Sequence, residues 1–129
     1  MNILLCFSKA ISEGLYNGDE NDILSLRIYL WRLYNDQNDS ERRYGALYTV
    51  ISEMYKTEYA DNCHNILALM NEKNEDEDFL LRAELWRNLG EFEKCKNLLA
   101  EVKKPEKYER YIFAIKAACD AENTLTVQV

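Results

Sequence analysis

The chain has 129 residues, and its content of 47% hydrophobic and 12% aromatic residues argues against disorder. Its formal net charge of -7 disfavours a nucleic-acid surface, which requires clustered Lys and Arg. No run approaches the roughly 20 apolar residues of a membrane helix, and MNILLCF is too short for a secretory signal. We therefore expect a cytoplasmic protein without nucleic-acid or membrane partners, although the abrupt apolar start also fits a domain of a longer protein.

The scarcity of helix breakers predicts an all-α fold. One proline and four glycines occur in the whole chain, which leaves room for long helices and few turns for a β-sandwich. The length suits one domain, and we expect a single helical domain over residues 1–123. The alternating tail TLTVQV, residues 124–129, has no obvious strand to pair with and is expected to fray.

The first predicted elements form a hairpin. Apolar residues at helical spacing predict a helix over residues 3–15 and a second over about 22–34. Asn17-Gly18 is a turn signal between them, so the first hairpin should turn near Gly18. Asp19 or Asn21 is expected to cap the second helix.

A second hairpin is predicted from the middle of the chain. The polar segment NDQNDS, residues 35–40, predicts a loop that ends in a helix cap. A long helix is expected from there to about Lys56, followed by a turn near Thr57 and a shorter helix to Met70. The acidic segment 71–78 is interpreted as a solvated loop that runs into the next helix, since a calcium loop needs a glycine.

The last predicted elements are a third hairpin and a closing helix. Two helices over about 78–89 and 92–103 are joined at Gly90. Pro105 ends this pair, and a last helix is expected over about 106–121. The chain is thus predicted to hold about seven helices, arranged as three antiparallel hairpins plus the closing helix.

Residues 76–107 resemble one tetratricopeptide repeat, a unit of two antiparallel helices. The segment WRNLG also fits the opening of that motif, but this register would place Gly90 inside a helix at a cost of about 1 kcal/mol. With Gly90 as the turn, Ala83 and Cys95 are small where the two helices must approach closely. The other matching positions are Phe79, Trp86, Phe92, Leu99 and Val102.

The resemblance implies a tetratricopeptide-like right-handed array, with an irregular bundle of seven helices as the alternative. It also implies a non-catalytic protein-protein interaction module, because such repeats present the inner face of their first helices to an extended peptide or partner helix. In this chain that face would carry four residues, of which two are best suited to hydrogen-bond a partner backbone or carboxylate. The face comprises Leu80 and Glu84 together with the two favoured residues, Arg87 and Asn88.

Self-association is an alternative function, either of this protein or of a longer one that contains it. Nine tyrosines and two tryptophans exceed what a thin helical array can hide. Tyr108, Tyr111 and Phe113 lie on more than one side of the last predicted helix. Part of this helix should therefore be exposed and could form an interface of a homo-oligomer.

The sequence indicates no catalytic or cofactor site, and no metal or cofactor is expected. His64 is the only histidine, and it follows Cys63, so their side chains would point about 100° apart on a helix. No C-x-x-C pair occurs, and the cysteines are interpreted as reduced, small core residues. An enzyme with an unrecognised site is the least favoured alternative. The four cysteines are Cys6, Cys63, Cys95 and Cys119.

Overall fold

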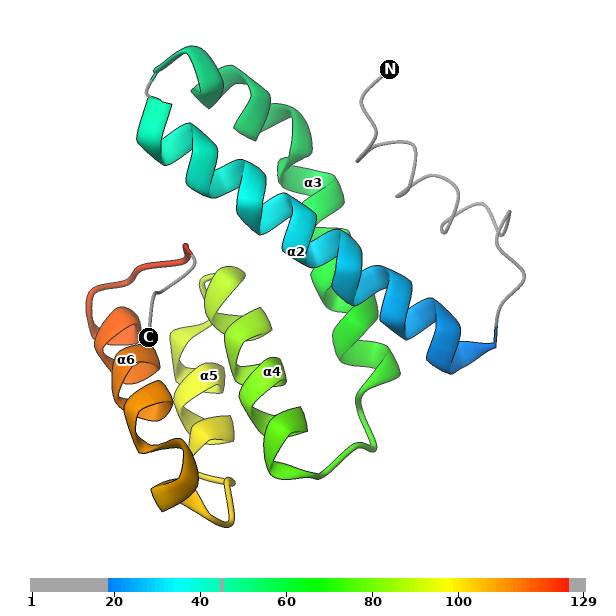
Figure 1. The fold of residues 1–129 in the computed structure, drawn as a ribbon, viewed down its shortest axis with the longest axis vertical. Helices are drawn as coiled ribbons and strands as arrows, with labels where there is room; N and C mark the ends of the chain where they lie inside the picture. The colour runs from blue at the N-terminus through cyan, green and yellow to red at the C-terminus, as the bar shows by residue number, and fades with distance from the viewer. Residues whose placement is uncertain (1–18, 45, 126–129) are drawn as a thin grey trace. The chain divides into compact units, whose positions relative to one another are not determined.

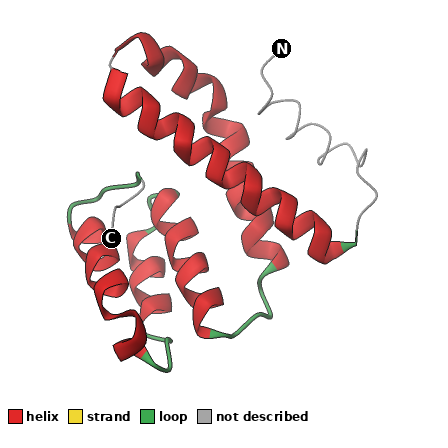
Figure 2. Ribbon diagram, in the orientation of Figure 1, coloured by secondary structure: helices red, strands yellow, loops and turns green. Residues whose placement is uncertain are grey.

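The computed structural model describes residues 19–44 and 46–125, and it describes side-chain burial for residues 19–36 and 56–125. Five α-helices hold 77% of the described residues, and these residues include no strand (Figure 2). The all-helical prediction is confirmed for this part of the chain. The structure divides into two compact units, residues 1–69 and 70–129, where the sequence predicted a single domain over residues 1–123.

The first unit contains an antiparallel hairpin of two long helices, α2 (Glu20–Tyr44) and α3 (Ala46–Leu69) (Figure 1). Asp19 caps α2, because its Oδ1 accepts the backbone N–H of Asp22 at 2.9 Å, as the sequence predicted. The predicted helix over 3–15 and the turn at Gly18 lie outside the described residues.

Two predicted breaks in the first unit are wrong. The segment 35–40 belongs to α2, and Thr57 lies within α3, so two helices replace the three that were predicted there. Asn, Asp, Gln and Ser each disfavour a helix by no more than about 0.7 kcal/mol, whereas glycine disfavours it by about 1 kcal/mol. Gly45, itself outside the described residues, is the position between the end of α2 and the start of α3.

Hydrogen bonds across the hairpin stabilise the helical conformation of the segments that were predicted to be a loop and a turn. Tyr59, in the predicted turn, donates its hydroxyl to Oδ1 of Asn35, in the predicted loop, at 2.9 Å. Further along, Asn62 Nδ2 donates to the carbonyl of Arg27 at 3.0 Å, and Arg27 Nη1 donates back to Asn62 Oδ1 at 3.1 Å. Arg27 and Asn62 are both buried, so these bonds satisfy polar groups that are removed from water.

The second unit consists of α4 (Asp76–Asn88), α5 (Phe92–Leu99), a 3-10 helix η1 (Pro105–Tyr108) and α6 (Glu109–Asp120). The three α-helices run alternately up and down, with α5 between α4 and α6 in the view of Figure 1. The predicted helix over 78–89 and the hairpin turn at Gly90 are confirmed. The second predicted helix of the hairpin, 92–103, ends early at Leu99, and Pro105 opens η1 rather than an α-helix.

Two helix ends share one geometry. After α4, the N–H groups of Gly90 and Glu91 bond the carbonyls of Arg87 and Trp86, which is the Schellman pattern. After α6, the N–H groups of Glu122 and Asn123 bond the carbonyls of Cys119 and Ala118 in the same way. Gly90 has a φ of +81° and Glu122 a φ of +51°, so both residues lie in the left-handed region.

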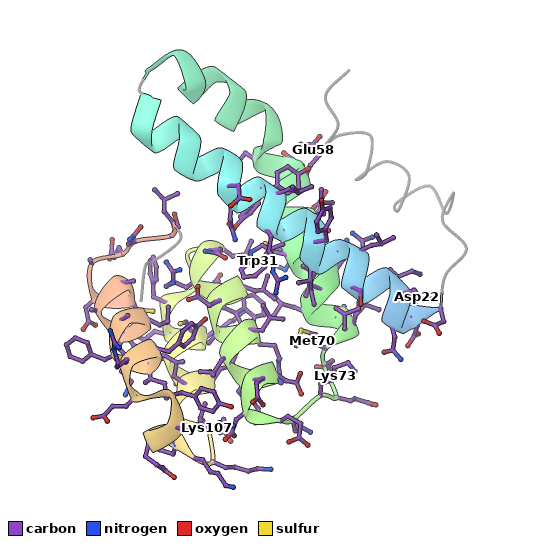
Figure 3. All side chains as sticks on the ribbon, viewed as in Figure 1. Asp22, Trp31, Glu58, Met70, Lys73 and Lys107 are labelled. Atoms are coloured by element: carbon purple, nitrogen blue, oxygen red, sulfur yellow. The ribbon has the colours of Figure 1, made fainter. Side chains whose placement is uncertain are left out.

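Side chains from all three α-helices form one apolar core in the second unit, and sticks fill the space between them in Figure 3. Ala83 and Cys95 are fully buried in it, which agrees with the small residues predicted at the close contact of α4 and α5. The buried members are Phe79, Leu80, Ala83, Cys95, Leu99, Val102, Ile112, Ile115 and Cys119.

The start of α4 is tied to the chain after α5. The Asp76 carboxylate accepts the backbone N–H groups of Lys103 and Lys104 at 2.8 and 3.1 Å. The hydrogen bond from Lys103 is the main reason that the pKa of Asp76 lies below its usual value. The acidic residues at the start of α4 thus complement the helix N-terminus, as predicted, and one of them also fixes the loop before η1.

Replacing Ala83 by leucine is expected to overpack the core and lower the free energy of unfolding by about 1–3 kcal/mol. Urea unfolding followed by circular dichroism measures this change. Ala117→Leu is the control on an exposed position of α6 and should stay within about 0.5 kcal/mol of the parent. Equal effects of the two substitutions would contradict the position of Ala83 in the core.

Substitutions at the two left-handed turns are expected to act in opposite directions. Gly90→Ala should lower the free energy of unfolding by about 1–2 kcal/mol, because a Cβ disfavours the left-handed conformation. This cost is conformational, since no atom lies within 4 Å of the added Cβ. Glu122→Gly should raise the stability by about 0.5–2 kcal/mol. Urea unfolding measures both changes in the free energy of unfolding. Changes of the same sign would contradict the left-handed conformation of the two turn residues.

Candidate functional site

Three polar side chains lie together on the second half of α4. Glu84, Arg87 and Asn88, which we name the α4 polar cluster, are all buried. Arg87 and Asn88 follow Glu84 by three and four residues, so each is a neighbour of Glu84 on the helix surface. The chain that follows α6, residues 123–125, lies against them through hydrogen bonds.

Arg87 and Glu84 form a bidentate ion pair. Nε and Nη2 of Arg87 donate to Oε1 and Oε2 of Glu84, each at 3.0 Å. The Arg87 side chain has an exposed fraction of 0% and that of Glu84 has 10%. Burial lowers the pKa of the Arg87 guanidinium, but the hydrogen bonds and charge of Glu84 outweigh this, so its pKa is raised overall. The guanidinium is therefore a permanently charged donor within the unit.

The cluster binds three successive main-chain carbonyls. Arg87 Nη1 donates to the carbonyls of Asn123 at 2.6 Å and of Leu125 at 2.7 Å. Asn88 Nδ2 donates to the carbonyl of Thr124, between them, at 2.7 Å. Four of the five N–H donors that a guanidinium carries are thus engaged by Glu84 and the tail. Both of its hydrogen bonds to residues 123–125 are to main-chain carbonyls.

The tail is shaped for this contact by its own first residue. Asn123 Oδ1 accepts the backbone N–H of Leu125 at 3.0 Å, a local turn of the kind that asparagine favours. The left-handed residue Glu122 precedes it and redirects the chain after α6. Sequence reasoning missed this segment, and the only signal was the turn-forming Asn123 directly after the last helix.

The structure corrects two predictions about this region. Thr124 and Leu125, predicted to fray, have their carbonyls bound, while residues 126–129 lie outside the described part. The predicted face on α4 is not open to solvent. Leu80 is a member of the apolar core, and Arg87 is covered by the tail. Glu84 and Arg87, two residues of that face, are paired with each other.

The aromatic residues of the last helix have different surroundings. Tyr108 is half-buried, and its hydroxyl donates to Oε1 of Glu77. The Nζ of Lys107, a residue labelled in Figure 3, lies 4.0 Å from the same oxygen. Tyr111 packs against the core, and burial raises its pKa. Phe113 has an exposed fraction of 76%, so the aromatic exposure predicted for this helix is concentrated there.

The residues considered for thiol or metal chemistry are separated. Cys63 is fully buried, and burial raises its pKa to about 12, whereas the adjacent His64 is exposed. Within residues 19–44 and 46–125, no group of three or more His, Cys, Asp or Glu side chains could hold a metal ion. In the same part of the chain, none of the helices combines the length and the apolar character needed to cross a bilayer.

Comparisons with protein-family models, with curated proteins and with solved structures find no match to this chain. The tetratricopeptide resemblance of residues 76–107 therefore rests on the sequence pattern. The geometry of the α4 polar cluster carries the functional argument.

Removing the Arg87 charge is expected to destabilise the second unit. Arg87→Ala leaves Glu84 buried without its partner and should lower the free energy of unfolding by about 3–5 kcal/mol. Lys96→Ala is the control, since Lys96 forms an exposed ion pair with Asp120 that should contribute no more than about 1 kcal/mol. Urea unfolding measures both, and a loss below about 1 kcal/mol for Arg87→Ala would contradict the described burial.

Proposed function

We propose that this protein is a non-catalytic interaction module that binds an extended segment of a partner protein at the α4 polar cluster. The observation that carries the proposal is the binding of three successive main-chain carbonyls by Arg87 and Asn88. Every residue of a polypeptide offers such a carbonyl, so the cluster selects a main-chain segment rather than a particular side chain. The tetratricopeptide resemblance implies the same class of ligand.

Residues 123–125 act in this proposal as a ligand that belongs to the chain itself. They follow α6 after a short turn, which gives them a high effective concentration at the cluster. A partner segment has to displace them, and it replaces their three carbonyls with its own. Because the charge of Arg87 is already compensated by Glu84, the partner segment needs no carboxylate.

Self-association is the second candidate, and the exposure of Phe113 favours it. A phenylalanine residue with an exposed fraction of 76% is unusual for a folded helix and suits an interface. A tail exchanged between two copies would also reproduce the contacts of residues 123–125. The two candidate functions differ in whether a free peptide is enough to bind at the α4 polar cluster.

The proposal is tested with a chain truncated after Glu122 and a labelled synthetic peptide, NTLTVQV, that corresponds to residues 123–129. Fluorescence anisotropy should show binding to the truncated chain and at least tenfold weaker binding to the full chain, whose own tail competes. Circular dichroism establishes that the truncated chain is folded. A folded truncated chain that does not bind the peptide would refute the proposal.

The same assay assigns the contact to the cluster. Asn88→Ala removes the donor to the middle carbonyl but leaves the Glu84–Arg87 pair, and it should weaken peptide binding about two- to tenfold. Asn97→Ala, on an exposed position of α5, is the matched control and should leave binding unchanged. Equal binding by the two variants would place the peptide elsewhere.

A further inference from the structure

We propose that Cys95 and Cys119 form a dithiol that oxidises reversibly to an intramolecular disulfide between α5 and α6. Their Sγ atoms lie 3.2 Å apart and share a hydrogen bond. Both side chains are buried in the core of the second unit, with exposed fractions of 0% and 3%. The inference is independent of peptide binding.

The geometry requires a small movement to form the bond. A disulfide has an S–S distance of about 2.05 Å, so the two sulfurs must approach by about 1.2 Å from their separation of 3.2 Å. Both residues belong to one packed core, which holds the two sulfurs next to each other. Cys63 offers a contrast, since it lies in the first unit and hydrogen-bonds with Tyr59.

One of the two cysteines lines a cavity. It has a volume of about 440 Å³, and Cys119 lines it together with Gly90, Phe92, Lys96 and Glu122. Cys95 is not among the lining residues. We therefore assign Cys119 as the thiol that meets the oxidant and Cys95 as the thiol that resolves the product.

With hydrogen peroxide as the oxidant, the reaction balances in two steps. The Cys119 thiolate attacks one peroxide oxygen, the O–O bond breaks, and the leaving hydroxide takes up a proton to become water. The Cys119 sulfenic acid is then attacked by the Cys95 sulfur, the S–O bond breaks, and a second water leaves. The pair loses two electrons and two protons, and the peroxide is reduced to two molecules of water.

Burial controls how fast the pair reacts. It raises the pKa of the Cys95 thiol, as does the hydrogen bond with Cys119. Since the thiolate is the reactive form, the attack of Cys95 on the sulfenic acid, which closes the disulfide, should be slow at neutral pH and faster as the pH rises. The pair is thus suited to sustained oxidation rather than to rapid catalysis.

The test uses the full chain with Cys6→Ser, which leaves three cysteines. The protein is treated with hydrogen peroxide at pH 8, denatured, blocked with N-ethylmaleimide and weighed by intact mass spectrometry. We expect three adducts before oxidation and one afterwards, with the loss of two hydrogen atoms and restoration by dithiothreitol. Peptide mapping should place the bond between Cys95 and Cys119, and a non-reducing gel should show a monomer.

Three double variants separate the pair from the remaining cysteine. Cys6→Ser combined with Cys95→Ser or with Cys119→Ser should form no intramolecular disulfide, whereas Cys6→Ser with Cys63→Ser should lose both of its adducts. The proposal is overturned if the parent keeps three adducts, if the bond involves Cys63, or if the adducts are lost by oxygen addition that dithiothreitol does not reverse.

Discussion

The second unit is organised around one buried charge. The guanidinium of Arg87 has no exposed surface, and a charge removed from water is tolerated only when it is paired and hydrogen-bonded. Glu84, three residues earlier on the same helix, supplies the charge, and the carbonyls of Asn123 and Leu125 supply the remaining acceptors. The path of the chain after α6 is therefore coupled to a residue in the last turn of α4.

Because of this coupling, the residues that stabilise the second unit are also the residues of the proposed binding site. A buried Arg–Glu pair alone contributes little net stability, because the cost of desolvation offsets much of the attraction. Here the pair also presents one guanidinium nitrogen, Nη1, to main-chain carbonyls, and Asn88 adds a donor beside it. The arrangement binds main-chain carbonyls of residues 123–125 through side-chain donors, and the proposed function depends on this property.

The helical hairpin of α4 and α5 could be predicted because its signals are local. Gly90 adopts the left-handed conformation that ends a helix, and Ala83 and Cys95 are small where the helices meet. Glu122 shows the limit of such signals, because it has the same role at the end of α6 without being a glycine. The first unit shows the opposite error. Polar residues near Asn35 suggested a loop, but this segment is helical, and the hydroxyl of Tyr59 donates a hydrogen bond to Asn35 there.

The sequence by itself determined the all-α class and the turn at Gly90, and it limited the cap of α2 to Asp19 or Asn21, of which Asp19 caps the helix. Each depends on residues within one helical turn, where backbone and side-chain preferences act directly. Tertiary structure alone decided the burial of Arg87, its contact with a carbonyl 36 residues away and the approach of Cys119 to Cys95. These contacts join separate helices, so they exist only once the packing of the core has placed the helices side by side.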